Sequence, residues 1–303
     1  MTEPKKMNKE QPILLVGDNP FHGISHLSQQ SVKNRGTEIT RAKHASDIVK
    51  TSIENGANGF MFSVSETTLS ILKMLPEKET KERLNLYALV PYAYEYVRLA
   101  THEGGLPGLA KRFAKEVLQS GNFKTVGFGL KGVLTSDPMD LMKAYLSYEI
   151  IRIKASAKNR GVLRSVLLHE VITDMAIALN LESLIKSYIK FMIDHEIEPG
   201  FETRNFSYLV KKFKEWDIDF KGLVLAAPFN KIGFYMNSSK VECEKALIDV
   251  SGSSVIVMSI LAAGYLKPAE ATEYVRGLPN VYAIVVGVSN EQQARETFRL
   301  LGA

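Results

Sequence analysis

Four charged or titratable side chains in the second half of the chain could carry acid–base chemistry. His169 and Glu170 follow one apolar run, Glu202 follows the next, and Arg204 comes two residues later. A histidine titrates near neutral pH and a neighbouring carboxylate can fix its tautomer, so His169 with Glu170 or Glu202 could transfer protons. Arg204 could hold a carboxylate or phosphate oxygen. A structural hydrogen-bond network is the alternative explanation.

A second polar group lies in the loop that begins at Gly17. Asp18 comes directly after an apolar run, and Asn19 and His22 follow it. We expect Asp18 to act on the substrate and Asn19 and His22 to bind it. His22 and His26 could also ligate a metal, but their loop contains Gly and Pro and offers no helix to align them. We therefore predict a hydrogen-bonded loop and no metal site.

Asn230 and Lys231 follow a further apolar run, Gly222–Ala226. A lysine at this point could form a Schiff base if its pKa were lowered by desolvation or by a cationic neighbour. A solvated loop lysine is the simpler alternative. We expect Asn230 to bind substrate hydroxyls and Tyr92, after another run, to line the site by stacking.

The end of the chain has the pattern of an anion site. The apolar run Val281–Val286 leads into a Gly-containing turn and a helix, with Asn290 as N-cap and Gln293 completing a capping box. Free N–H groups at a helix start attract anions, whereas Glu291 would repel them, so a capped helix that binds nothing is the alternative. The residues of this candidate phosphate site are Gly264, Gly287, Ser289 and Asn290.

These residues need a scaffold that gathers the ends of many strands. Eight apolar runs each end in polar or Gly/Pro residues and precede a helical stretch, and buried parallel strands have this continuous apolar pattern. Eight such units in 303 residues predict a (β/α)8 TIM barrel, in which the residues just past each strand form the site. The runs are Ile13–Val16, Gly59–Phe62, Leu86–Val90, Ser165–Leu168, Gly200–Glu202, Gly222–Ala226, Ser254–Met258 and Val281–Val286.

The spacing of the runs predicts one domain over residues 1–303. Residues 1–11 are charged and read as a flexible tail. The distance between the third and fourth runs exceeds that of an ordinary crossover, so residues 93–160 form a helical insertion. We expect this insertion to cover the barrel mouth as a lid, and packing on the side of the barrel is the alternative.

Composition excludes several classes of partner. The net charge of +5 is dispersed among acids, which argues against a nucleic-acid surface. No apolar run is long enough to span a membrane, and the single cysteine, Cys243, excludes an internal disulfide framework. We expect a cytoplasmic protein with a small-molecule substrate and leave the oligomeric state open.

The last 50 residues or so resemble the aldo-keto reductases. The segments VIVMSILAAGYL and YAIVVGVSNEQQARETF are similar to the closing strands of that family, and His169 after LLHE sits where its strand-4 histidine would sit. The resemblance implies that the two closing loops hold the phosphates of a nicotinamide cofactor. The family's catalytic aspartate, tyrosine and lysine are not matched, because the second and third runs end in FSVSE and VPY.

These observations together favour an enzyme of lyase or isomerase type. Its substrate would be a small anionic metabolite, with a phosphorylated one included, and no cofactor would be required. In this interpretation His169, Glu170, Glu202, Lys231 and Asp18 are the catalytic candidates. One alternative is an NAD(P)H-dependent oxidoreductase with a non-standard catalytic set, and another is a barrel that binds a ligand without catalysis.

Overall fold

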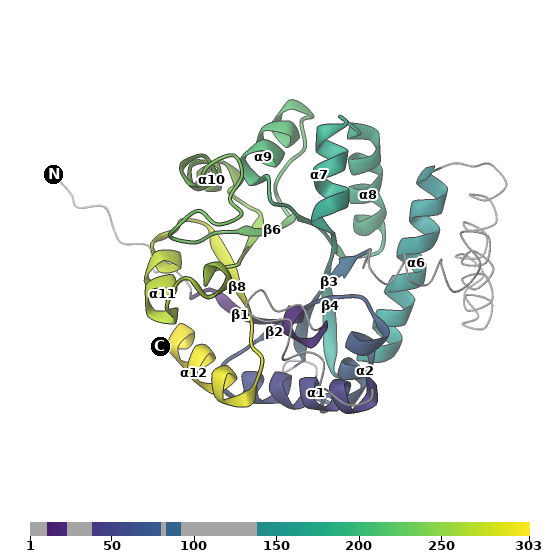
Figure 1. Cartoon of the computed structure of the whole chain (residues 1–303). Coiled ribbons are helices and arrows are strands. Elements are labelled where there is room, and N and C mark those ends of the chain that lie inside the picture. The colour runs from purple at the N-terminus through teal and green to yellow at the C-terminus, as the bar shows by residue number, and fades with distance from the viewer. Residues whose placement is uncertain (1–10, 23–37, 80–82, 92–137) are drawn as a thin grey trace.

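The computed structural model describes residues 11–22, 38–79, 83–91 and 138–303. Eight parallel strands pair in chain order and close into a barrel, because β8 also pairs with β1 (Figure 1). The predicted (β/α)8 barrel is confirmed. The strands are β1 (Ile13–Gly17), β2 (Gly59–Ser63), β3 (Leu84–Val90), β4 (Gly161–Leu168), β5 (Glu198–Glu202), β6 (Val224–Pro228), β7 (Ser254–Met258) and β8 (Val281–Gly287).

Helices surround the barrel as an outer ring (Figure 1). The α-helices in the described part of the chain are α1 (Glu38–Glu54), α2 (Glu66–Met74), α6 (Pro138–Ala157), α7 (Glu170–Ala178), α8 (Glu182–Asp194), α9 (Phe206–Glu215), α10 (Lys240–Ala246), α11 (Pro268–Gly277) and α12 (Glu291–Gly302). Short 3-10 helices are η1 (Asn19–His22), η4 (Leu247–Val250) and η5 (Ala262–Gly264).

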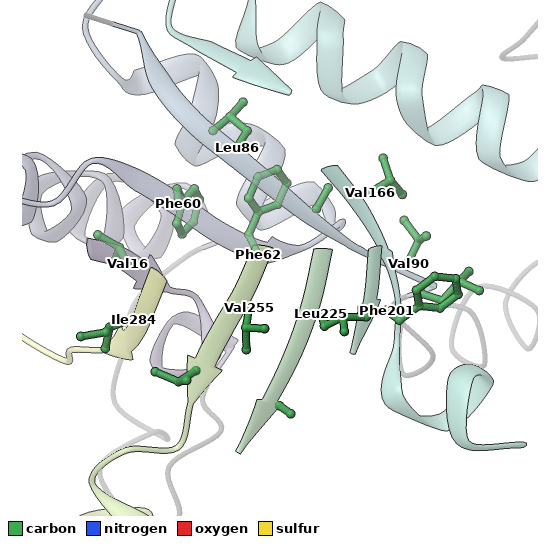
Figure 2. Packing of buried hydrophobic residues seen from close by; sticks show 14 of the residues in the cluster. Val16, Phe60, Phe62, Leu86, Val90, Val166, Phe201, Leu225, Val255 and Ile284 are labelled. Carbon is green, nitrogen blue, oxygen red and sulfur yellow. The ribbon is translucent and has the colours of Figure 1, made fainter. Parts of the chain in front are cut away.

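Most strands carry apolar side chains on both faces, as expected of parallel strands enclosed by helices. Outward-facing side chains such as Phe60, Phe201 and Val255 pack beneath the helices and form the larger core (Figure 2). Inward-facing side chains fill the barrel itself, with Leu15, Leu167 and others in contact. Side chains alternate between the two faces along a strand. Once the inward-facing apolar residues of a strand are known, the direction of the side chain at its last position follows.

The sequence missed one helix and misplaced the starts of several strands. β4 begins at Gly161 rather than Ser165, and β5 begins at Glu198 rather than Gly200. β6 begins at Val224 rather than Gly222, whose backbone is left-handed (φ 79°) and belongs to the turn before the strand. The helix α7 begins directly after His169, where the sequence analysis placed only polar rim residues. Ala176 and Ile177 are buried, while the exposed side of the helix carries the apolar residues Val171 and Met175. The sequence of α7 therefore lacks the polar face that would mark it as a surface helix.

The predicted insertion over residues 93–160 is described only in its last part. Here α6 packs against α2, α8 and β4, so it belongs to the outer ring (Figure 1). These contacts place α6 on the side of the barrel, and a lid formed by the rest of the insertion stays a prediction. Residues 93–137, Tyr92 and the expected tail before Gln11 lie outside the described residues. Among the described helices, none combines the length and apolarity needed to cross a bilayer.

Candidate active site

Glu202 is the buried carboxyl group at the centre of the site. Gly200 faces the barrel interior, because a Cβ there would lie 2.5 Å from Leu167 Cγ. By strand alternation Glu202, the last residue of β5, points inward as well. It is 8% exposed and accepts a hydrogen bond from the Glu170 backbone N–H (3.1 Å). Burial, reinforced by the Glu170 charge, raises the pKa of Glu202 to about 8.

His169 stands beside this carboxyl group with its ring orientation fixed. It is the N-cap of α7, and its Nδ1 accepts a hydrogen bond from the Val171 backbone N–H (3.2 Å). That bond places the proton of the neutral ring on Nε2, which lies 3.9 Å from Glu202 Oε2. Burial lowers the pKa of His169. At neutral pH the site therefore holds a neutral imidazole next to a protonated carboxyl group.

Asp18, the residue after β1, belongs to the same site as Glu202 and His169. Its Oδ2 accepts hydrogen bonds from the Ser63 backbone N–H at the end of β2 (2.7 Å) and pairs with His22 Nε2 (2.8 Å). Both side chains are buried. The Asp18 charge adds to the rise in the pKa of Glu202 and opposes the fall in the pKa of His169, so the three groups share one electrostatic environment. Asn19, the first residue of η1, is exposed.

Arg204 is held by two neighbours. Its Nε and Nη2 contact the two carboxylate oxygens of Glu170 at 2.6 Å each, and its guanidinium lies 4.2 Å from the centre of the Tyr235 ring. Glu170 therefore orients an arginine instead of standing behind His169. Hydrogen bonding with Glu170 raises the pKa of Arg204 against the opposing effect of burial.

Asp174 supports the loop that carries these groups, a role that the sequence analysis did not assign. Its carboxylate accepts hydrogen bonds from Thr203 Oγ1 (2.5 Å), the Arg204 backbone N–H (3.3 Å) and Asn205 Nδ2 (2.9 Å). Asp174 lies one turn after Glu170 on α7, and that i, i+4 spacing was the available signal.

Asn230 and Lys231 do not face the Glu202 cluster in the way the sequence suggested. The Asn230 amide is fully buried and exchanges two 2.8 Å hydrogen bonds with the backbone of Phe234, which shapes its own loop. The Lys231 side chain is about half exposed and pairs with Glu270 (3.4 Å). This exposure and this ion pair favour the solvated-lysine alternative, and a catalytic role for Lys231 stays a prediction.

The loop after β8 is built more tightly than the sequence indicated. Asn290 caps α12 by accepting from Gln293 N (2.8 Å), while Gln293 Oε1 accepts from Ser289 N (2.9 Å). The Ser289 N–H of the candidate phosphate site is therefore already bonded. A Cβ on Gly287 would lie 2.9 Å from Pro20 Cδ. The close approach of Pro20 is enough to require glycine there, and the binding of an anion at Gly287 stays a prediction.

The other end of the candidate phosphate site lies after β7. Gly264 ends η5 with a left-handed backbone (φ 90°), and the two alanines before it are also left-handed. Within the described residues, no three His, Cys, Asp or Glu side chains come together in a way that could hold a metal ion.

Comparison with known proteins finds similar structures but no similar sequences. No protein-family model and no characterised protein matches the chain. Two solved structures of Pseudomonas aeruginosa proteins assigned to the aldo-keto reductases align with 95% of this chain and 88% of theirs, with TM-scores of 0.55 and 0.54 at 13% and 12% identity. The barrel has the fold of the aldo-keto reductases. At this identity the likeness is one of fold.

The comparison corrects the reaction class inferred from the sequence. The lyase or isomerase interpretation is wrong, because the similar structures are assigned to a family of oxidoreductases. The resemblance in the last strands, which the sequence analysis placed second, was the better guide.

Proposed function

We propose that this protein is an NAD(P)H-dependent oxidoreductase that reduces a carbonyl group with a non-standard catalytic set. The observation that carries the proposal is Glu202, a carboxyl group that keeps its proton at neutral pH and lies beside the Nε2–H of His169. Carbonyl reduction needs a proton donor, and a pKa near the working pH suits that task. The aldo-keto reductase fold supports this reaction class.

The loops after β7 and β8 fit the phosphates of a nicotinamide dinucleotide. Within the described part of the chain, the Glu291 and Gln292 N–H groups at the start of the twelve-residue helix α12 donate to no other group. The Glu291 carboxylate does not block them, because it contacts Thr51 Oγ1 (3.3 Å) and Arg295 (2.9 Å). Helix N–H groups of this kind bind anionic oxygens. We propose that these two N–H groups bind the anion and that Gly264, Gly287, Ser289 and Asn290 form the loops that surround it.

The residues of the barrel mouth would act on the carbonyl oxygen. When bound, NAD(P)H would supply a hydride to the carbonyl carbon. His169 would donate a hydrogen bond from Nε2 to the oxygen, and Glu202 would transfer its carboxyl proton to it, giving an alcohol. Glu202 would then regain a proton from water. Asp18 would favour the protonated form of Glu202 through its charge.

Other parts of the proposal rest on the sequence. Asn19 and His22 remain proposed contacts to a small-molecule substrate, and Tyr92 remains a proposed wall of the site. We also propose that residues 1–303 form a single domain and that the protein works in the cytoplasm without a nucleic-acid partner.

The test is reduction of a panel of aldehydes and ketones by the purified protein with NADPH or NADH, followed by loss of reduced-nicotinamide absorbance. We expect Glu202→Gln, which keeps the shape but has no acidic proton, to lower kcat about 100-fold or more while leaving the cofactor Kd unchanged. Glu198→Gln, at the opposite end of β5, is the matched control and should stay active. Absence of cofactor binding, or full activity of Glu202→Gln, would refute the proposal.

A further inference from the structure

Arg204 is fixed on one edge and on one face. Glu170 contacts Nε and Nη2, and the Tyr235 ring lies against the guanidinium plane. Tyr235 reaches this position with a left-handed backbone (φ 60°), which is uncommon for a bulky residue. The two contacts come from different loops, since Glu170 begins α7 and Tyr235 follows β6. The guanidinium is therefore oriented before any ligand arrives.

Within the part of the chain that the structure describes, one edge of this guanidinium has no bonded partner. A guanidinium carries more N–H groups than the two bonds to Glu170 use, and those on Nη1 and the outer side of Nη2 form a second fork. The Arg204 side chain is 38% exposed. Two parallel N–H donors on a planar fork match the two oxygens of a carboxylate.

Arg204 belongs to the same group of charged residues as the proposed reaction centre. Arg204 and Glu202 are two residues apart at the same strand end, and the Arg204 charge influences the pKa values of both Glu202 and His169. A ligand held by Arg204 would therefore have its neighbouring atoms near the proton donor.

The charges around Arg204 favour the binding of a singly charged anion over a doubly charged one. Glu170 already balances much of the Arg204 charge, and Asp174 lies beneath the same loop. Lys231, the other cation that the sequence placed at this rim, is paired with Glu270. A dianionic phosphate would meet one half-neutralised cation and nearby carboxylates, whereas a carboxylate adds a single charge and fits the fork.

We propose that Arg204 anchors the carboxylate of the substrate, so that the compounds reduced are oxo acids whose carbonyl group lies close to the carboxylate. Glu170 and Tyr235 are positioning residues for this anchor. The substrate class rests on the proposed reductase function, but the anchor itself can be tested separately.

The first experiment measures binding without turnover. Calorimetry with propionate, a carboxylate that has no carbonyl group to reduce, should show binding that Arg204→Gln weakens about 10- to 100-fold. Arg164→Gln, an arginine on β4 that bonds to Asn85, is the matched control and should bind as the wild type does. Tighter binding of inorganic phosphate than of propionate, or equal binding by Arg204→Gln, would overturn the anchor.

The second experiment measures specificity. Wild-type protein should reduce a 2-oxo acid with a kcat/KM at least tenfold above that of its methyl ester. Arg204→Gln should remove that preference by raising the KM for the 2-oxo acid more than the KM for the ester. Tyr235→Leu, which keeps the charge and removes the platform, should lose part of the preference and provides a test if Arg204→Gln does not fold.

The two proposals fail in different ways. If esters and acids are reduced equally well, the substrate class is wrong and the reductase function stands. If no carbonyl compound is reduced but propionate binding depends on Arg204, the anchor stands and the reductase function is wrong.

Discussion

The proton on Glu202 should make the stability of the protein depend on pH in a defined direction. The folded protein holds this proton up to about pH 8, whereas an exposed carboxyl releases it near 4.5. Between these two values the folded state binds more protons than the unfolded state, so the free energy of unfolding must fall as pH rises. Below 4.5 and above 8 both states have the same charge at this residue, and its contribution is flat.

The size of the effect follows from the same two values. Each unit of pKa difference corresponds to about 1.4 kcal/mol, so the wild type should lose up to about 5 kcal/mol of stability across this window. Glu202→Gln removes the titration and keeps an oxygen for the Glu170 N–H. We therefore expect the variant to become more stable relative to the wild type as pH rises, with the difference levelling off near pH 8.

Urea unfolding at a series of pH values measures this difference directly. Glu182→Gln, which removes an exposed carboxyl paired with Lys186 on α8, is the control and should show no comparable trend. A wild-type minus variant difference that is independent of pH, or that changes in the opposite direction, would show that Glu202 is ionised in the folded protein. The proposed proton donor would then be wrong.

Three further predictions follow from the site. The kcat for carbonyl reduction should fall as pH rises above about 8, because Glu202 loses its proton there; a flat profile in stopped-flow assays would contradict this. Gly287→Ala should cost about 1–3 kcal/mol in thermal unfolding, because its Cβ would meet Pro20, and Pro20→Ala should restore much of it. Asn230→Ala should cost about 2–4 kcal/mol by breaking two buried hydrogen bonds, and an unchanged melting temperature would disprove that.

The sequence predicted the barrel because its signal is repeated. Each apolar run is weak alone, but eight runs separated by helices leave few other architectures. The rim positions of His169, Glu202 and Asp18 follow from the same rule, since parallel strands end at one face. Pairing was harder to predict, because the bonds of Arg204 to Glu170 join a loop after β5 to the start of α7 and depend on side-chain geometry.

Prediction from the sequence was ambiguous at positions where one residue type is compatible with two different roles. A glycine before a helix is compatible with a phosphate or with a crowded turn, and only the position of Pro20 distinguishes these for Gly287. An asparagine after a strand can bind a hydroxyl or shape its loop, as Asn230 does. The reaction class was missed because acid–base residues are common to many barrel enzymes.

The contact between Gly287 and Pro20 has a consequence for protein synthesis. Pro20 lies in the turn that carries Asp18 and His22, and Gly17 pairs with Gly287 where the first and last strands meet. A growing chain emerges from its N-terminus, so Asp18 is made early but has no partner strand on that side until the last strand is translated. The nascent chain therefore gains this side of the site only near the end of synthesis, and the earlier segments can fold without a working centre.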